Sequence, residues 1–146
     1  MGSTEIEQRS LVIENALSFL GTPFHENCCI KGVGTDCGRF LAAVYGASGI
    51  KVPDLKDISL FPHNWHLNKD DERYLSLMLQ FSKITTMPQI ADMVFFRIGR
   101  GWAHSGIILD YPIIIHAAPP CVSKANADQL SRINKNQRLF LTPWGI

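Results

Sequence analysis

The chain has 146 residues, of which 46% are hydrophobic and 18% charged, and a formal net charge of +1. This composition excludes an intrinsically disordered chain, and a net charge so close to zero provides no broad field for nucleic acid or anionic lipid. The length suits one domain, so we expect residues 1–146 to form a single domain with a substantial core.

Neither a membrane span nor a signal peptide is predicted. The most apolar run, 107–115, is interrupted by Asp110 and Pro112 and is too short to cross a bilayer. Glu5 and Glu7 occupy the place where a signal peptide has its apolar segment. We therefore expect the chain to be cytoplasmic as synthesised.

Three helices are predicted in the first part of the chain, at 4–20, 36–48 and 70–83. Thr4 and Glu7 have capping-box spacing at the start of the first helix, and Gly21 follows its end. The segment 24–35, which contains two glycines, is predicted to be a loop. The third helix begins with acidic residues, which favour the positive end of the helix dipole.

The second part of the chain is predicted to form strands, at 91–98, 102–109, 113–117 and 137–142. A short capped turn is expected between Asn126 and Gln129. Helices followed by strands, with no repeat and no linker, favour an α+β fold.

Cys37 is the first candidate for chemistry, because it falls in the first turn of the second predicted helix. Unpaired N–H groups and the helix dipole lower the pKa of a thiol in that position and favour the nucleophilic thiolate. The same N–H groups can donate to an oxyanion, and Asp36 is placed to cap the helix. The alternative is that Cys37 is a small buried residue without a chemical role.

His104 and His116 each place one polar ring in an apolar predicted strand. If the two strands form a hairpin centred near position 110, the two rings lie nearly opposite each other. With Cys37, this gives a nucleophile, a base (His104) and a residue that orients the base (His116). The alternative is that both are hydrogen-bonded core histidines.

The same side chains leave a zinc site open as another interpretation, since Cys37, His104 and His116 would supply three ligands. A further ligand would come from the loop that precedes the second helix, from His25, Cys28 or Cys29. No pair has a usual zinc spacing and there is no C-x-x-C pair, so we expect no metal and four reduced cysteines. Trp65 and His66 fall in a loop, where they either line a cleft or face solvent.

Several short motifs together resemble the NlpC family of cell-wall cysteine peptidases. They are GTPF at 21–24, GTDCG at 34–38, ADMVFF at 91–96, HSGI at 104–107 and IHA at 115–117. Each motif is weak alone, but their order and the spacing of both histidines are fairly specific. The segments 31–34 and 65–75 also resemble the branch of that family that is encoded with phage tails.

The resemblance implies a papain-like fold in which the helix that carries Cys37 packs on a central antiparallel sheet. It implies hydrolysis of amide bonds in peptidoglycan stem peptides by a Cys37–His104–His116 triad, with no cofactor. It also implies peptidoglycan as the substrate partner and phage tail proteins as further partners, with delivery to the cell wall in a virion. Oxyanion or substrate contacts are expected from Phe24, His25, Asp36, Gly38, Trp65 and His66.

The sequence departs from the family pattern at three positions. Phe24 stands where the family has a tyrosine that helps to bind the oxyanion or the substrate amine. Ala91 stands where the family has a glycine, which matters only if that residue has a positive φ. Gly38 stands where serine is frequent. Two alternatives therefore stay open: a weakly active or non-catalytic peptidoglycan-binding tail component, and an amidase or acyltransferase on the same fold.

Overall fold

The computed structural model describes residues 4–55, 73–98, 101–130 and 137–146. Its helices are α1 (Glu5–Ser18), α2 (Cys37–Ala47) and α3 (Arg73–Leu79), with a 3₁₀ turn η2 (Ala127–Gln129). Its strands are β1 (Cys29–Ile30), β2 (Gly34–Thr35), β3 (Lys83–Ile84), β4 (Met93–Ile98), β5 (Gly101–Asp110), β6 (Ile113–Ala118), β7 (Cys121–Asn126) and β8 (Arg138–Thr142). No helix in the described ranges is long and apolar enough to cross a membrane.

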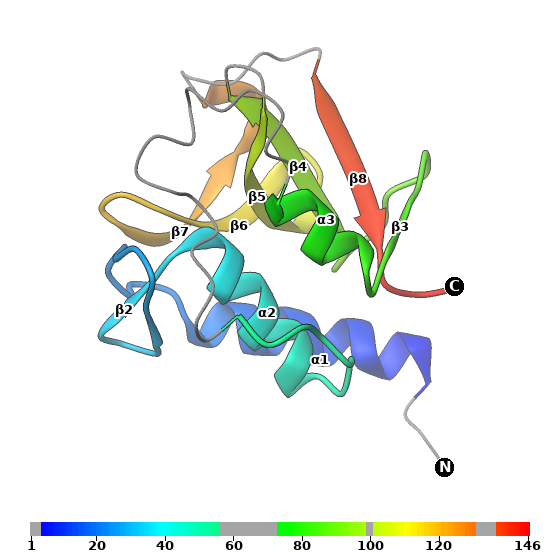
Figure 1. Ribbon diagram of the computed structural model, residues 1–146, viewed down its shortest axis with the longest axis horizontal. Coiled ribbons are helices and arrows are strands. Elements are labelled where there is room, and N and C mark those ends of the chain that lie inside the picture. Colours follow the sequence, from blue (N-terminus) through cyan, green and yellow to red (C-terminus); the bar gives the residue numbers. More distant parts are fainter. Residues whose placement is uncertain (1–3, 56–72, 99–100, 131–136) are drawn as a thin grey trace.

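A six-stranded antiparallel sheet, in the order β3-β8-β4-β5-β6-β7, forms one layer of the molecule. Helix α2 packs against β5 and β6, α3 packs against β5, and α1 packs against α2 (Figure 1). The predicted α+β, papain-like arrangement, with the helix that begins at Cys37 packed on the sheet, is therefore confirmed.

Capping side chains begin the first two helices as the sequence predicts. Thr4 Oγ1 accepts a hydrogen bond from the Glu7 backbone N–H at 3.1 Å, and Asp36 Oδ1 accepts one from the Arg39 N–H at 2.8 Å. The capped turn at Asn126 is also confirmed, because its side chain accepts from the Asp128 N–H.

Several predicted boundaries are wrong. The segment 24–35 is not all loop, because it contains the antiparallel β1–β2 hairpin, whose strands of two residues are too short to show any periodicity. Strand β7 was not predicted, because it lies at the edge of the sheet and its exposed polar residues break the apolar pattern. The third helix ends at Leu79, and Lys83 instead pairs with Thr142 in the sheet; residues 70–72 lie outside the described residues.

Strand β4 is buried on both of its faces, because successive side chains of a strand point to opposite sides. Met93 and Phe95 pack in the larger core between the sheet and the helices, with Phe40 and Tyr45 of α2. The alternate residues of β4 belong to a smaller core on the other face, formed by Val94, Phe96, Ile108, Ile114 and Ala127.

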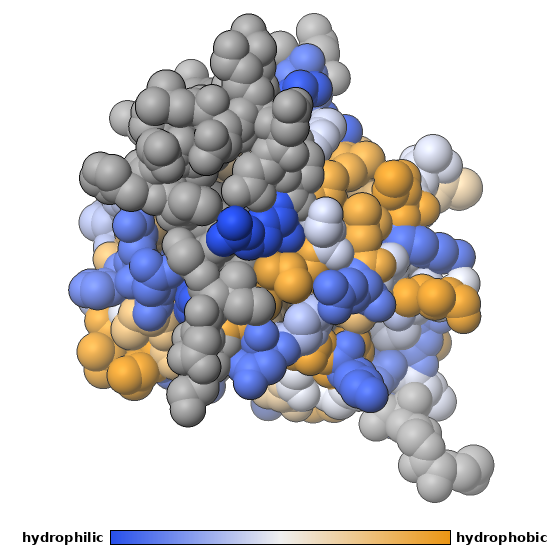
Figure 2. Space-filling model, viewed as in Figure 1, coloured by the Kyte–Doolittle hydropathy of each residue, from blue (hydrophilic) through white to orange (hydrophobic). Residues whose placement is uncertain are grey.

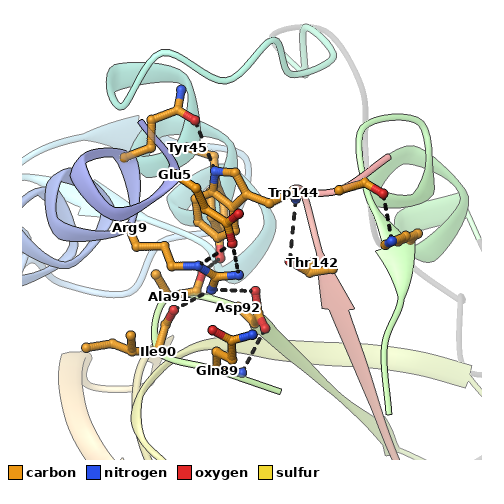
Figure 3. Close-up of polar contacts among 12 residues, drawn as sticks. Glu5, Arg9, Tyr45, Gln89, Ile90, Ala91, Asp92, Thr142 and Trp144 are labelled. Atoms are coloured by element: carbon orange, nitrogen blue, oxygen red, sulfur yellow. Dashed lines mark hydrogen bonds and ion pairs between the residues drawn. The ribbon is translucent and has the colours of Figure 1, made fainter. Parts of the chain in front are cut away.

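Arg9 joins α1 to the start of β4 and to the last residues of the chain (Figure 3). Its guanidinium donates to Glu5 Oε1 and to Asp92 Oδ1, both at 2.9 Å, and to the Ile90 carbonyl at 2.6 Å. The same group lies 4.1 Å from the centroid of the Trp144 ring. A buried ion pair with this many partners fixes three separate segments against one another.

Ala91 adopts a positive φ of 74°, in the left-handed region that favours glycine. Its backbone is held on both sides, because its N–H donates to the Ile108 carbonyl and its carbonyl accepts from the Tyr45 hydroxyl. The replacement of the family's glycine by alanine therefore falls at a position that requires this conformation.

Apolar side chains also reach the surface on the side of the molecule where β3 and β8 lie (Figure 2). Ile84 in β3 is 56% exposed and Met87, which follows it, is 78% exposed. Strand β3 has two residues, and so short an edge strand limits pairing with other chains.

Candidate active site

Cys37 lies at the N-terminus of α2, and its thiol is directed at the backbone of β5. The side chain is 4% exposed, and Sγ donates to the Ala103 carbonyl at a distance of 3.8 Å. Asp36 caps the helix immediately before it. The sequence therefore placed Cys37 correctly on the helix, and the tertiary structure sets it beside the strand that carries His104.

Burial, together with the negative charge of Asp36, raises the pKa of the Cys37 thiol to about 12. The backbone N–H groups of Gly38, Cys37 and Ser105 act in the opposite direction but do not prevail. The prediction of a thiolate favoured by the helix N-terminus is therefore wrong for this conformation. The reason is that loss of water around a buried thiolate outweighs the N–H groups of one helix end.

His104 and His116 form a direct pair: His104 Nε2 lies 2.7 Å from His116 Nδ1. Burial lowers the pKa of His104 to about 3, with a contribution from His116, and burial also lowers the pKa of His116. Both rings are therefore neutral at pH 7. The Phe96 ring stacks on the His104 imidazole, and the two ring centroids are 5.9 Å apart.

The two histidines come together diagonally, and not directly across the ladder as predicted. Ile107 pairs with Ile115, and the register shifts between Ile108 and Asp110. Gly106 consequently lies against His116, where an added Cβ would be 3.3 Å from the His116 Cβ. The absence of a side chain at Gly106 leaves room for the His116 ring to reach His104.

The neighbouring side chains of His104 and Ser105 point to opposite faces of β5. His104 pairs with Phe96 and shares its face, whereas Ser105 contacts Tyr74 of α3 on the helix side. With His104 Nε2 directed at His116, Nδ1 is the ring nitrogen that is left for another proton donor or acceptor.

Both carboxylate oxygens of Asp36 accept hydrogen bonds from other groups of the protein. Oδ2 accepts from Arg39 Nη1 at 2.8 Å and from the Asn27 N–H at 2.9 Å, while Oδ1 serves as the helix cap. The carboxylate is 2% exposed. Its contacts make it a support for the turn that precedes Cys37, and the substrate contact expected from the sequence stays a prediction.

The remaining predicted site residues differ in their burial and in their contacts. Phe24 is half-buried and its backbone is bonded to the Pro120 carbonyl, while His25 is exposed and its ring lies 2.9 Å from the Glu26 carbonyl. The Gly38 N–H acts to lower the pKa of Cys37, and its role as an oxyanion donor stays a prediction. Trp65 and His66 lie outside the described residues.

Tyr74 and Ser105 were missed by the sequence analysis. Ser105 lies between His104 and Gly106, a position that could have drawn attention to it, but nothing in the sequence connects it to Tyr74. The structure also places a cavity of about 700 Å³ beside α2, bounded by Cys29, Arg39 and Leu55 among others. Neither Cys37 nor either histidine lines it, so this cavity is separate from the candidate triad.

All four cysteines are free thiols. Across the described ranges, no three His, Cys, Asp or Glu side chains gather closely enough to hold a metal ion. The structure therefore brings together two neutral imidazoles, carried by β5 and β6, while the Cys37 thiol of α2 contacts the backbone of β5.

Solved structures with this architecture are NlpC/p60 domain proteins. RipD from Mycobacterium tuberculosis, described as a non-catalytic NlpC/p60 domain protein adapted to peptidoglycan binding, matches with a TM-score of 0.59 and 14% identity, over 92% of this chain and 95% of RipD. The NlpC/p60 domain of the peptidoglycan hydrolase SagA matches with a TM-score of 0.55 and 16% identity, over 92% of this chain and 97% of that domain. This chain has the NlpC/p60 fold.

The peptidoglycan hydrolase RipB from Mycobacterium tuberculosis matches with a TM-score of 0.57 and 15% identity, over 94% of this chain and 64% of RipB. No protein-family model and no curated protein matches the sequence. The fold is thus shared by hydrolases and by a protein described as non-catalytic, and function has to be argued from the site.

Proposed function

We propose that the protein is a cysteine hydrolase that cleaves amide bonds in peptidoglycan stem peptides. Cys37 acts as nucleophile, His104 as base and His116 as the residue that orients the base. The observation that carries this proposal is the 2.7 Å contact between His104 Nε2 and His116 Nδ1, one residue from the carbonyl that accepts the Cys37 thiol. The peptidoglycan hydrolases SagA and RipB, which have the same fold, support the choice of substrate.

In the proposed reaction, His104 Nδ1 takes the proton from Cys37 Sγ, and the thiolate attacks the amide carbonyl carbon. His104 Nε2–H donates to His116 Nδ1, which fixes the tautomer and the plane of the ring. The protonated His104 then gives its proton to the leaving nitrogen, the C–N bond breaks and a thioester remains. Water attacks the thioester with His104 as base, which releases the acid and restores the thiol.

The oxyanion would be held by backbone N–H groups at the start of α2, including that of Gly38. Phe24 lacks the hydroxyl that the family's tyrosine provides, and loss of one oxyanion donor costs on the order of 10²–10³ in rate. We therefore expect slow turnover. Because the sequence also resembles the phage-type branch, we extend the proposal to a tail-associated enzyme that is made in the cytoplasm and delivered to the wall.

The proposal is tested by incubating purified muropeptides with the wild-type protein and with Cys37→Ala, and by weighing the products by mass spectrometry. Cys121→Ala, which changes a thiol outside the triad, is the matched control. New fragments from the wild type and the control, but not from Cys37→Ala, are expected, and their masses identify the bond. Equal fragments from Cys37→Ala would overturn the assignment of the nucleophile.

A second candidate function is peptidoglycan binding without catalysis. It is favoured by the neutral, buried Cys37 thiol, whose hydrogen bond goes to the Ala103 carbonyl, and by Phe24. RipD provides a precedent on this fold. Retention of the protein on purified cell walls without any new fragment would support binding, whereas transfer of an acyl group to an added amine would identify an acyltransferase.

A further inference from the structure

Tyr74, in the first turn of α3, contributes a buried hydroxyl next to the proposed nucleophile. The hydroxyl is hydrogen-bonded to Ser105 Oγ, and the two residues are 2% and 0% exposed. The Tyr74 ring packs on Phe95 with centroids 5.1 Å apart, which holds the phenol in place. Burial raises the pKa of Tyr74, and the charge of a Cys37 thiolate raises it as well, so the two groups are electrostatic neighbours.

Ser105 connects Tyr74 to the candidate triad. Its side chain contacts Tyr74, while its backbone N–H is one of the groups that lower the pKa of Cys37. Of the two residues before it, Ala103 accepts the thiol hydrogen bond at its carbonyl, and His104 is the proposed base, paired with His116. The hydrogen bond between Tyr74 and Ser105 therefore anchors residues 103–105 of β5. These residues either contact Cys37 or, in the proposed reaction, exchange a proton with it.

We propose that Tyr74 is a positioning residue that acts through Ser105 to hold residues 103–105 of β5 against Cys37. The inference rests on the proposed function, because it gives these contacts a role in activating the thiol. Tyr74 acts through its hydrogen bond to Ser105. Its effect is on the direction of the Ser105 N–H and on the distance between the thiol and His104.

The test compares Tyr74→Phe with Tyr45→Phe. Both substitutions remove one buried hydroxyl and keep the ring, but Tyr45 donates to the Ala91 carbonyl at the other end of α2. The rate of Cys37 alkylation by iodoacetamide is followed by mass spectrometry between pH 7 and 10, with Cys121 as internal reference. Tyr74→Phe is expected to slow Cys37 alkylation about tenfold, because the Ser105 N–H is no longer held toward the thiol, and Tyr45→Phe is expected to leave the rate unchanged.

Ser105→Ala provides the second variant, because it removes the partner hydroxyl and leaves Tyr74 in place. If both hydroxyls act through one bond, the double variant alkylates no more slowly than either single variant. On muropeptides, kcat should fall about tenfold in Tyr74→Phe with little change in KM, since the substrate is not contacted. Additive effects of the two substitutions would overturn the coupling.

Alkylation needs no substrate, so the two proposals fail separately. An absence of muropeptide fragments, with Cys37 still slowed in Tyr74→Phe, would overturn the proposed function and retain the positioning role. Fragments from the wild type, with equal Cys37 alkylation in Tyr74→Phe and in the wild type, would overturn the positioning role alone. Chemical denaturation confirms that each variant is folded under the conditions of the assay.

Discussion

The structure contains two buried aspartate–arginine pairs that serve different purposes. Asp36 and Arg39 are three residues apart and support the turn before Cys37, whereas Asp92 and Arg9 are 83 positions apart and join α1 to the sheet. All four side chains are at most 10% exposed. The local pair shapes the chemistry of a thiol, and the long-range pair holds segments together, so the same interaction serves two purposes.

Removing one charge from either pair should produce the largest effect on stability. Asp92→Asn and Asp36→Asn each remove a buried carboxylate that pairs with a buried guanidinium, which costs about 3 kcal/mol of unfolding free energy. Urea denaturation measures this change. Asp128→Asn is the control, because Asp128 is 53% exposed in its pair with Arg138 and its loss should cost less than about 1 kcal/mol. Equal losses in all three variants would contradict the role of burial.

The rate of Cys37 alkylation should distinguish the two aspartate–arginine pairs, because only Asp36 affects the pKa of the thiol. The charge of Asp36 raises the pKa of Cys37, so Asp36→Asn should lower that pKa and speed alkylation at a fixed pH. Asparagine also caps helices well, so α2 keeps its start. Asp92 is not among the groups that shift the thiol, and Asp92→Asn should therefore alkylate at the wild-type rate. Faster alkylation in both variants would indicate general loosening of the fold.

Acid should lower the free energy of unfolding of the protein through its buried histidines. His104 titrates near 6.5 in the unfolded chain and at about 3 in the folded protein, so the unfolded state binds more protons between these values. Stability attributable to His104 is complete above about pH 6.5 and falls by up to about 1.4 kcal/mol per pH unit toward pH 3. Urea denaturation at several pH values measures the slope, and His104→Gln should reduce it. An unchanged slope in that variant would assign the acid sensitivity to other groups.

The smallest effect is expected at Ala91, beside the long-range pair. Ala91→Gly relieves a left-handed conformation that costs roughly 1–2 kcal/mol, but it removes a buried methyl group worth about 0.8 kcal/mol. The variant should therefore be as stable as the wild type or slightly more stable. Ala117→Gly, also fully buried, lacks the positive φ and should be destabilised by about 1 kcal/mol. Thermal unfolding of the two variants compares them directly.

The fold was predictable where a local signal was strong. Thr4 and Asp36 begin their helices because short polar side chains cap the first free N–H groups, and the apolar strands of the central sheet follow from their pattern. Strands β1 and β2 were not predictable, since two residues show no periodicity. Strand β7 was missed because an edge strand with exposed polar residues lacks the apolar pattern of the central strands.

In the candidate site, too, the features that depend on local sequence spacing were predictable and those that depend on packing were not. The sequence located Cys37 on a helix N-terminus and paired His104 with His116, because both follow from spacing along one segment or one hairpin. The ionisation of the thiol was mispredicted, since burial depends on what packs against it. The role of Asp36 as a cap was local and predictable, while its bond to the Asn27 backbone was not.

By itself, the sequence determined the α+β class, the place of Cys37 in the first turn of α2 and the proximity of the two histidines. Capping, periodicity and hairpin pairing act over a few residues, and this is why they can be predicted from the chain alone. Only the tertiary structure decided that Cys37 is neutral, that Gly106 makes room for His116 and that Tyr74 lies against Ser105. Those features depend on burial and on contacts between segments distant in the chain, for which no local pattern exists.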